Sequence, residues 1–522
     1  MQIENQVQPA VCRLNGISKS FGDIQALCDV TFEVRKGEFL AIVGENGAGK
    51  STAMGVLFGL LEPDAGHITV AGERRKLKSA RDAIDAGFGM VHQHFKLYPD
   101  LTVLENVLVG YEGANGFGLV PFQERRKAVA SLIREFEFTL DLDRKISDMP
   151  VDARQQVEIV KMLFRGASVV ILDEPTAVLT PQECVTLYAM LKRLCAQGKS
   201  VVLITHKLGE VMDHSERVLV MRHGALVAER KTSETDQSEL AELMVGRQIE
   251  AVEKISRIQP QVVACLQGVS VQSGSDKPRL DGVSIELRAG EIFGVAGVTG
   301  NGQKELVNAV MGLEKNSAGQ IIFQGRDIGG LTVAERRQIG IGYMAEDRMT
   351  IGLAARGTIA ENLIAGREGS SPKGAVREGH SGFSSYGFLH WRQIRDHAQR
   401  LVKNYDIRTP SAMQRVGNLS GGNQQKVVVA RELSAAPKLL VVENPCWGVD
   451  VGAISFIHRQ ILQLAETGAA ILLISNDLEE LFELSDRVGV MFEGRMNRVF
   501  DRTELDAFAV GAAMSGDEEQ RP

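Results

Sequence analysis

Short apolar runs alternate with amphipathic stretches along this chain. Runs 39–43, 169–172 and 201–204 are apolar without interruption, which is typical of strands buried on both faces of a parallel sheet. Polar and apolar residues between these runs recur with helical spacing. The alternation predicts α/β units around mostly parallel sheets, with an antiparallel β segment at the start of each unit.

The first of these runs leads into the sequence GENGAGKS, which follows the GxxxxGK[ST] pattern of a phosphate-binding loop, and a predicted helix follows. Glycines let backbone N–H groups converge on phosphates, and the helix adds the positive end of its dipole. A glycine-rich turn that binds nothing would not account for Lys50 and Ser51, which are expected to contact the β/γ-phosphates and Mg²⁺. The predicted nucleotide contacts are Gly44, Glu45, Asn46, Gly47, Ala48, Gly49, Lys50, Ser51 and Thr52.

Composition narrows the class of protein. A length of 522 residues predicts two or more domains, and a net charge of −7 argues against broad nucleic-acid binding. No apolar run is long enough to span a bilayer, and the first residues lack the pattern of a signal peptide. The six cysteines are scattered without a CxxC pair, so they are expected to be reduced packing residues rather than metal ligands.

The chain is an internal repeat. The segment RKGEFLAIVGENGAGKS aligns with RAGEIFGVAGVTGNGQK, which pairs Lys50 with Gln303 at an offset of 253 positions. Further on, Asp173 pairs with Glu443 at an offset of 270, so the second half carries about 17 additional residues. Most of them are placed in 367–387, a segment rich in glycine, serine and charge that predicts a mobile loop.

Both repeats, together with the run LSGGNQQK and the spacing of the motifs, resemble the ATP-binding subunits of ABC transporters over about residues 11–509. The resemblance implies two P-loop NTPase domains, 11–235 and 262–509, joined by a connecting segment, 236–261. Each is expected to hold a mostly parallel sheet, an antiparallel β subdomain and a helical subdomain. The segments PTAVLTPQE and LSGGNQQK look like the class that imports simple sugars and nucleosides, and 91–95 slightly favours the nucleoside branch.

The resemblance also assigns roles in the first half. Asp173 would hold Mg²⁺, and Glu174 would act as the general base on the attacking water. His206 would contact the γ-phosphate, and Gln93 would touch Mg²⁺ or water. Phe21 stands where the family stacks an aromatic ring on adenine, the alternative being a phenylalanine of the core.

In this family the halves form a head-to-tail ATP sandwich within one chain. The second half would supply the signature residues Ser420, Gly421 and Gly422 at a helix start, where N–H groups can bind the γ-phosphate. Asp450 matches a loop that crosses between the halves.

The second half departs from the family pattern at its own nucleotide side. Gln303 and Lys304 replace the lysine and the hydroxyl residue of the loop, and Glu443 stands for the Mg²⁺ aspartate. Asn444 replaces the general base, and its amide cannot accept a proton from the attacking water. Asn476 replaces the histidine.

In the first half, 149–152 reads MPVD where LSGG is expected. Head-to-tail pairing would place every serious defect in one composite site. One hydrolytic site and one degenerate site per chain are therefore expected, with ATP and Mg²⁺ as the ligands.

The resemblance implies two membrane-spanning permease subunits and an extracytoplasmic substrate-binding protein. The chain would lie on the cytoplasmic face of the cell membrane, docked through 95–110 and its counterpart 347–366. The alternative is a soluble tandem ABC protein that remodels ribosomes, but that branch usually has a long charged linker and two intact sites. A DNA-repair protein of this superfamily would need zinc-binding cysteines, which are not arranged that way here.

Overall fold

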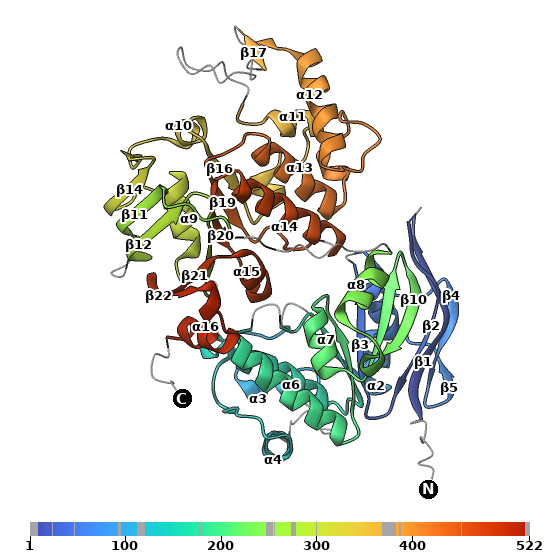
Figure 1. Ribbon diagram of the computed structural model, residues 1–522. Coiled ribbons are helices and arrows are strands. Elements are labelled where there is room, and N and C mark those ends of the chain that lie inside the picture. The colour runs from blue at the N-terminus through green and yellow to red at the C-terminus, as the bar shows by residue number, and fades with distance from the viewer. Residues whose placement is uncertain are drawn as a thin grey trace. The chain divides into compact units, whose positions relative to one another are not determined.

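The computed structural model divides the chain into two compact units, Met1–Ile249 and Glu250–Pro522. Figure 1 shows the helices and strands of both units. The structure describes residues 9–22, 24–45, 47–91, 96–111, 121–176, 179–246, 254, 256–272, 278–298, 300–367, 383–385, 388–449 and 451–516.

Unit 1 is built on a six-stranded sheet in the order β10-β9-β3-β8-β7-β6. The inner strands are parallel, and only β10 pairs antiparallel, with β9. These strands are β3 (Phe39–Gly44), β6 (Phe88–Val91), β7 (Val169–Asp173), β8 (Ser200–Ile204), β9 (Arg217–Arg222) and β10 (Ala225–Lys231).

Alternate residues of the parallel strands face two separate cores, which explains their uninterrupted apolar sequence. Val170 and Leu172 join the core formed with the helical part, whereas Val169 and Ile171 join the core formed with the antiparallel sheet. That sheet has the order β2-β1-β4-β5, with β1 (Ala10–Phe21), β2 (Ile24–Arg35), β4 (Ala65–Val70) and β5 (Glu73–Arg75).

The helices cover both faces of the sheet. Three of them, α3, α4 and α5, pack on one another as a helical subdomain. The unit 1 helices are α1 (Lys50–Leu57), α2 (Ala80–Asp85), α3 (Val103–Leu108), α4 (Phe122–Glu135), α5 (Val151–Phe164), α6 (Pro181–Ala196), α7 (Leu208–His214) and α8 (Gln237–Val245). The last of them stops at Gly246, whose φ of 78° is left-handed and favours glycine.

Unit 2 repeats this architecture. Its six-stranded sheet has the order β16-β19-β20-β13-β21-β22 and its antiparallel sheet the order β12-β11-β14-β15. The strands are β11 (Val262–Val271), β12 (Leu280–Arg288), β13 (Ile292–Ala296), β14 (Ala318–Phe323), β15 (Arg326–Asp327), β16 (Ile341–Met344), β19 (Leu439–Glu443), β20 (Ala470–Ile474), β21 (Arg487–Phe492) and β22 (Arg495–Asp501).

Its helices are α9 (Gln303–Met311), α10 (Val333–Gln338), α11 (Ile359–Ile364), α12 (Trp391–Asn404), α13 (Gly421–Leu433), α14 (Val451–Glu466), α15 (Leu478–Leu484) and α16 (Ala507–Met514). The predicted fold class of two α/β P-loop domains with antiparallel and helical parts is confirmed.

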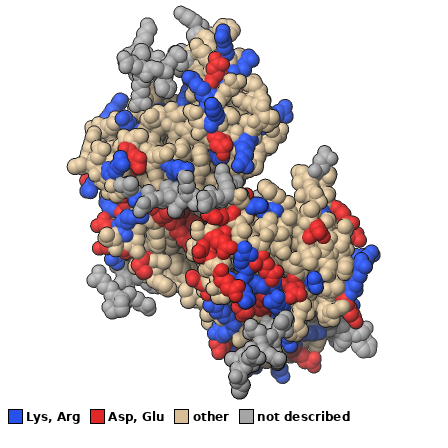
Figure 2. All heavy atoms as spheres, turned by 45° about the vertical axis from the view of Figure 1, so that its right-hand side comes forward, with Lys and Arg blue, Asp and Glu red and all other residues tan. Residues whose placement is uncertain are grey.

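The additional segment of the second half lies largely outside the described residues. Where it is described, β17 (Ser384–Ser385) pairs antiparallel with β18 (Phe388–Leu389), so the end of the expected loop forms a short strand pair. Within the described ranges, no helix is both long and apolar enough to cross a membrane. On the face of each unit that Figure 2 shows, basic and acidic side chains are interspersed.

Candidate functional site

The phosphate-binding loop of unit 1 connects the end of β3 to the start of α1. Gly47 and Gly49 have φ values of 82° and 100°, which glycine adopts without strain. A Cβ on Gly49 would lie 2.7 Å from the carbonyl oxygen of Ala26, so no side chain fits there. The loop therefore keeps a backbone surface that a phosphate can approach closely.

Lys50 is buried at the base of this loop. Its Nζ donates to the carbonyl oxygens of Gly44 at 2.6 Å and Glu45 at 3.1 Å. Burial lowers the pKa of the Lys50 ammonium, while the carboxylates of Glu174 and Asp173 oppose that shift. Lys50, Asp173 and Glu174 thus form one electrostatic cluster at the carboxyl ends of β3 and β7.

The two acidic residues of this cluster titrate differently. Burial raises the pKa of Asp173, and the neighbouring negative charge of Glu174 adds to the rise. The hydrogen bond from His206 lowers the pKa of Glu174. Glu174 Oε1 lies 2.9 Å from His206 Nδ1, so Glu174 is held as the carboxylate. Its φ of 48° is left-handed, and its N–H donates to the carbonyl oxygen of Ile204 at 2.8 Å.

A network around Glu210 supports this pair, and nothing in the sequence pattern indicated it. Tyr188 OH donates to Glu210 Oε2 at 2.7 Å, and Thr205 Oγ1 donates to the same oxygen at 3.2 Å. Thr176 Oγ1 donates to Glu210 Oε1 at 2.5 Å. Thr176 follows Glu174 closely and Thr205 precedes His206. Glu210 therefore connects the loop that carries Glu174 to the loop that carries His206.

Other predicted contacts of unit 1 are placed as follows. Phe21, at the end of β1, is 48% exposed, so it is not a residue of the core, and Lys19 Nζ lies 5.8 Å from its ring centroid. Ser51 is exposed and Thr52 half-buried in the first turn of α1. The predicted residues Asn46, Gln93 and Asp450 lie outside the described residues.

The signature segment lies in unit 2, where Ser420 precedes α13. Its side chain makes no hydrogen bond to the first-turn backbone; instead, Asn423 Nδ2 donates to Ser420 Oγ at 2.9 Å. The N–H groups of the first turn of α13 have no partner within the helix, as at any helix start. This end of α13 therefore offers backbone donors to an anion.

Arg348 contacts the signature segment, and sequence reasoning missed it. Its guanidinium donates to the carbonyl oxygens of Trp447 at 2.7 Å and Gly448 at 3.1 Å. A Cβ on Gly421 would lie 2.7 Å from Arg348 Nη2, so a side chain at this position would displace the guanidinium. Arg348 thus joins the segment after β16 to the loop after β19 and to the start of α13.

The nucleotide side of unit 2 keeps the backbone geometry but not the chemistry. Asn444 has a φ of 40°, and its N–H donates to Ile474 at 2.8 Å, as Glu174 does to Ile204. Its side chain accepts a hydrogen bond from the N–H of Asn476 at 2.8 Å and donates to Glu346 at 3.0 Å. The oxygen and the nitrogen of the Asn444 amide are therefore both hydrogen-bonded within unit 2.

The loop of unit 2 lacks a lysine at the position of Lys50. Gln303 Nε2 donates to the carbonyl oxygen of Val298 at 3.2 Å. Burial raises the pKa of Glu443. The hydroxyl of Tyr343 donates a hydrogen bond to the Glu443 carboxylate, which opposes this rise. In unit 1, α5 begins after Pro150 at the position of the signature, with no side-chain cap.

Known proteins resemble the chain over nearly its whole length. The family profile described as ABC transporter matches residues 27–177 and 280–446. The nucleoside import ATP-binding protein NupA of Lactococcus lactis is 38% identical, over 97% of this chain and 98% of the relative. The glucose import ATP-binding protein TsgD13 of Haloferax volcanii is also 38% identical, over 97% and 95%.

Among solved structures, a chain of the complex of archaeal ribosomal stalk protein aP1 with the ribosome recycling factor aABCE1 matches with a TM-score of 0.61. The match covers 96% of this chain and 92% of that chain at 20% identity. At this identity the match shows a shared fold and nothing about function.

Proposed function

Since the chain belongs to the ABC transporter family and is an ATPase of that family, we propose that it drives an importer from one hydrolytic site. The cargo is a nucleoside or a simple sugar, which passes through separate permease subunits. The main support is a difference between the units. Unit 1 has the Glu174–His206 pair beside Lys50, whereas unit 2 has Asn444 at the position of Glu174.

Glu174 is the general base of the proposed site. The hydrogen bond from His206 keeps its carboxylate ionised at neutral pH, so it can accept a proton from the attacking water. Asn444 offers an amide oxygen that already accepts from the backbone of Asn476, so it cannot take that role. Hydrolysis therefore occurs where unit 1 supplies the phosphate-binding loop.

The residues of unit 1 also fit Mg²⁺. The Asp173 carboxylate and the exposed Ser51 hydroxyl are oxygen ligands, which Mg²⁺ prefers. The raised pKa of Asp173 reflects burial and repulsion by Glu174, and a cation favours the ionised carboxylate. Mg²⁺ would neutralise charge on the β- and γ-phosphates, with Gln93 completing the predicted set.

The proposed hydrolytic site is composite. The phosphate-binding loop of unit 1 would act with Ser420, Gly421 and Gly422, whose N–H groups at the start of α13 suit the γ-phosphate. The opposite pairing joins Gln303 to the segment after Met149, which lacks the signature. That second site would bind nucleotide without hydrolysing it. Gly302 retains a left-handed φ of 105°, which keeps the loop open to a phosphate.

Partners follow from the same proposal. The chain would dock on the cytoplasmic face of two permease subunits that receive cargo from an extracytoplasmic binding protein. Closing of the halves on ATP would favour one access state of the permeases, and hydrolysis would restore the other.

Uptake of labelled cargo tests the proposed activity. We expect cells that contain the permeases and this chain to accumulate radiolabelled nucleosides in an ATP-dependent way, and cells without the chain to lose that uptake. Pentoses and hexoses serve as the comparison. Accumulation of a sugar alone would move the cargo to the sugar branch, and the absence of any chain-dependent uptake would contradict the import function.

We expect Leu101→Arg to weaken docking on the permeases. Leu101 is half-buried in the segment before α3, next to Tyr98, which is 55% exposed. An apolar contact of this size stabilises a complex by about 1.5–3 kcal/mol, so a charge there lowers affinity about 10- to 100-fold. Co-purification with the permeases measures the effect, and Leu60→Arg is the control because Leu60 is 53% exposed elsewhere in unit 1. Equal recovery of both variants would reject this docking surface.

A further inference from the structure

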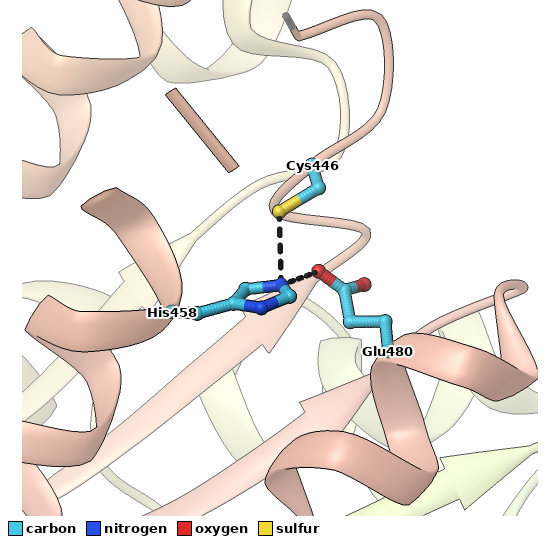
Figure 3. Close-up of side chains that lie close together, drawn as sticks. All are labelled: Cys446, His458 and Glu480. Carbon is cyan, nitrogen blue, oxygen red and sulfur yellow. Dashed lines mark hydrogen bonds and ion pairs between the residues drawn. The ribbon is translucent and has the colours of Figure 1, made fainter. Parts of the chain in front are cut away.

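Three side chains from three separate elements meet in unit 2. Cys446 lies in the loop after β19, His458 on α14 and Glu480 on α15 (Figure 3). The sulfur of Cys446 lies 3.4 Å from His458 Nε2, and Glu480 Oε1 lies 3.0 Å from the same nitrogen. All three potential ligand atoms lie within 4.8 Å of one another. Figure 3 shows the sulfur and the carboxylate approaching this nitrogen from different directions.

The surroundings orient these groups. His458 and Glu480 are 3% and 5% exposed. Ser475 Oγ donates to Glu480 Oε2 at 2.6 Å, which leaves Oε1 facing the cluster. His458 Nδ1 lies 3.2 Å from the carboxylate of Glu483. A histidine that ligates a metal through one nitrogen usually donates its other N–H to such a carboxylate.

Unit 1 provides an internal comparison. At the offset of 270, Cys446, His458 and Glu480 correspond to Thr176, Tyr188 and Glu210. The unit 1 residues form a network of hydroxyl groups on one carboxylate. Unit 2 keeps the glutamate and replaces both hydroxyl groups by a thiol and an imidazole, which are metal-ligating groups. The same framework thus carries a hydrogen-bonded network in one unit and a ligand set in the other.

We propose that Cys446 Sγ, His458 Nε2 and Glu480 Oε1 form a binding site for Zn²⁺ or a similar divalent cation. A thiolate with an imidazole and a carboxylate suits Zn²⁺, whereas Mg²⁺ prefers oxygen ligands alone. Thiolate and carboxylate together carry two negative charges, which balance the cation in a buried place. This site is separate from the proposed Mg²⁺ ligands of unit 1.

Protons compete with the cation. Burial opposes the charged form of His458, but hydrogen bonds to Glu480 and Glu483 outweigh it and raise its pKa to about 9. Burial raises the pKa of the Cys446 thiol well above its usual value. Binding of the cation displaces the protons that the thiol and the imidazole carry. The apparent affinity therefore falls as the pH decreases.

The bound cation would join the loop after β19 to α14 and α15. Arg348 holds the same loop through the carbonyl oxygens of Trp447 and Gly448. The loop leads to the predicted interface residue Asp450. Occupancy of the site would therefore restrict this loop without taking part in hydrolysis.

Titration of the full-length, chelator-treated chain with Co²⁺ tests the proposal. We expect one Co²⁺ per chain with a thiolate-to-cobalt charge-transfer band, and displacement of the band by Zn²⁺ but not by Mg²⁺. Glu483→Gln should weaken binding about 10- to 100-fold, as loss of a carboxylate behind a histidine ligand does.

Matched variants separate this site from adventitious binding. Cys446→Thr and His458→Tyr reproduce the unit 1 chemistry, so we expect them to fold and to lose the band. Cys184→Ser removes a partly exposed thiol of unit 1 and should keep it. A wild-type chain without the band, or a band that survives Cys446→Thr, would overturn the proposal.

Discussion

We expect the replacement of Glu174 by Gln to reduce ATP turnover of the assembled transporter by about 10²- to 10⁴-fold, the range that a general base contributes. The amide keeps the size of the side chain but cannot accept the proton of the attacking water. His206 lies 2.9 Å from the carboxylate and can still hydrogen-bond to the amide oxygen, so the loop is expected to keep its place. Phosphate release by the reconstituted complex measures the effect.

The matched control is Asn444→Glu in unit 2. It places a carboxylate at the equivalent backbone position, where the φ of 40° resembles the 48° of Glu174. The unit 2 loop still lacks the lysine, so we expect turnover to change less than about twofold. Turnover that survives Glu174→Gln would show that another base acts, and the proposal of a single hydrolytic site would then be wrong.

We expect the replacement of Lys50 by Ala to lower ATP binding and to reduce kcat by about 10²- to 10³-fold, the usual loss when a preorganised phosphate donor is removed. Lys50 is 7% exposed and its Nζ is held at the loop by two carbonyl oxygens, so its position is set before phosphate arrives. Binding of a fluorescent ATP analogue and phosphate release measure the two effects separately.

Gln303→Ala is the matched control for Lys50→Ala. Gln303 occupies the same place in the loop of unit 2 but carries no charge, and its amide bonds only Val298 among the described residues. We expect this variant to retain turnover within about threefold. Similar losses in both variants would mean that the two loops contribute equally, against the asymmetry proposed here.

The two units differ in chemistry more than in backbone. Glu174 and Asn444 share a left-handed conformation and the same backbone hydrogen bond to β8 or β20. Likewise Glu210 and Glu480 each collect side chains from three loops or helices. The strand–loop–helix framework has therefore been kept while the groups presented on it have changed.

The local sequence by itself determined much of this protein. Uninterrupted apolar runs predicted the parallel strands, because such strands contact a core on each face. The motif around Lys50 predicted a phosphate-binding loop between a strand and a helix, which β3 and α1 provide. The offset between the repeats also located Gln303 and Asn444, so the chemical loss in the second half was readable from residue type alone.

Only the tertiary structure decided which distant side chains meet. The partner of Glu174 is 32 residues away, and Arg348 reaches Trp447 across 99 residues. Cys446 and Glu480 converge on His458 although neither spacing resembles a metal motif. Such contacts depend on the order of strands in the sheet and on where each strand ends, because parallel strands bring their carboxyl ends to one edge. Local periodicity determines that a strand forms, but not which strand becomes its neighbour.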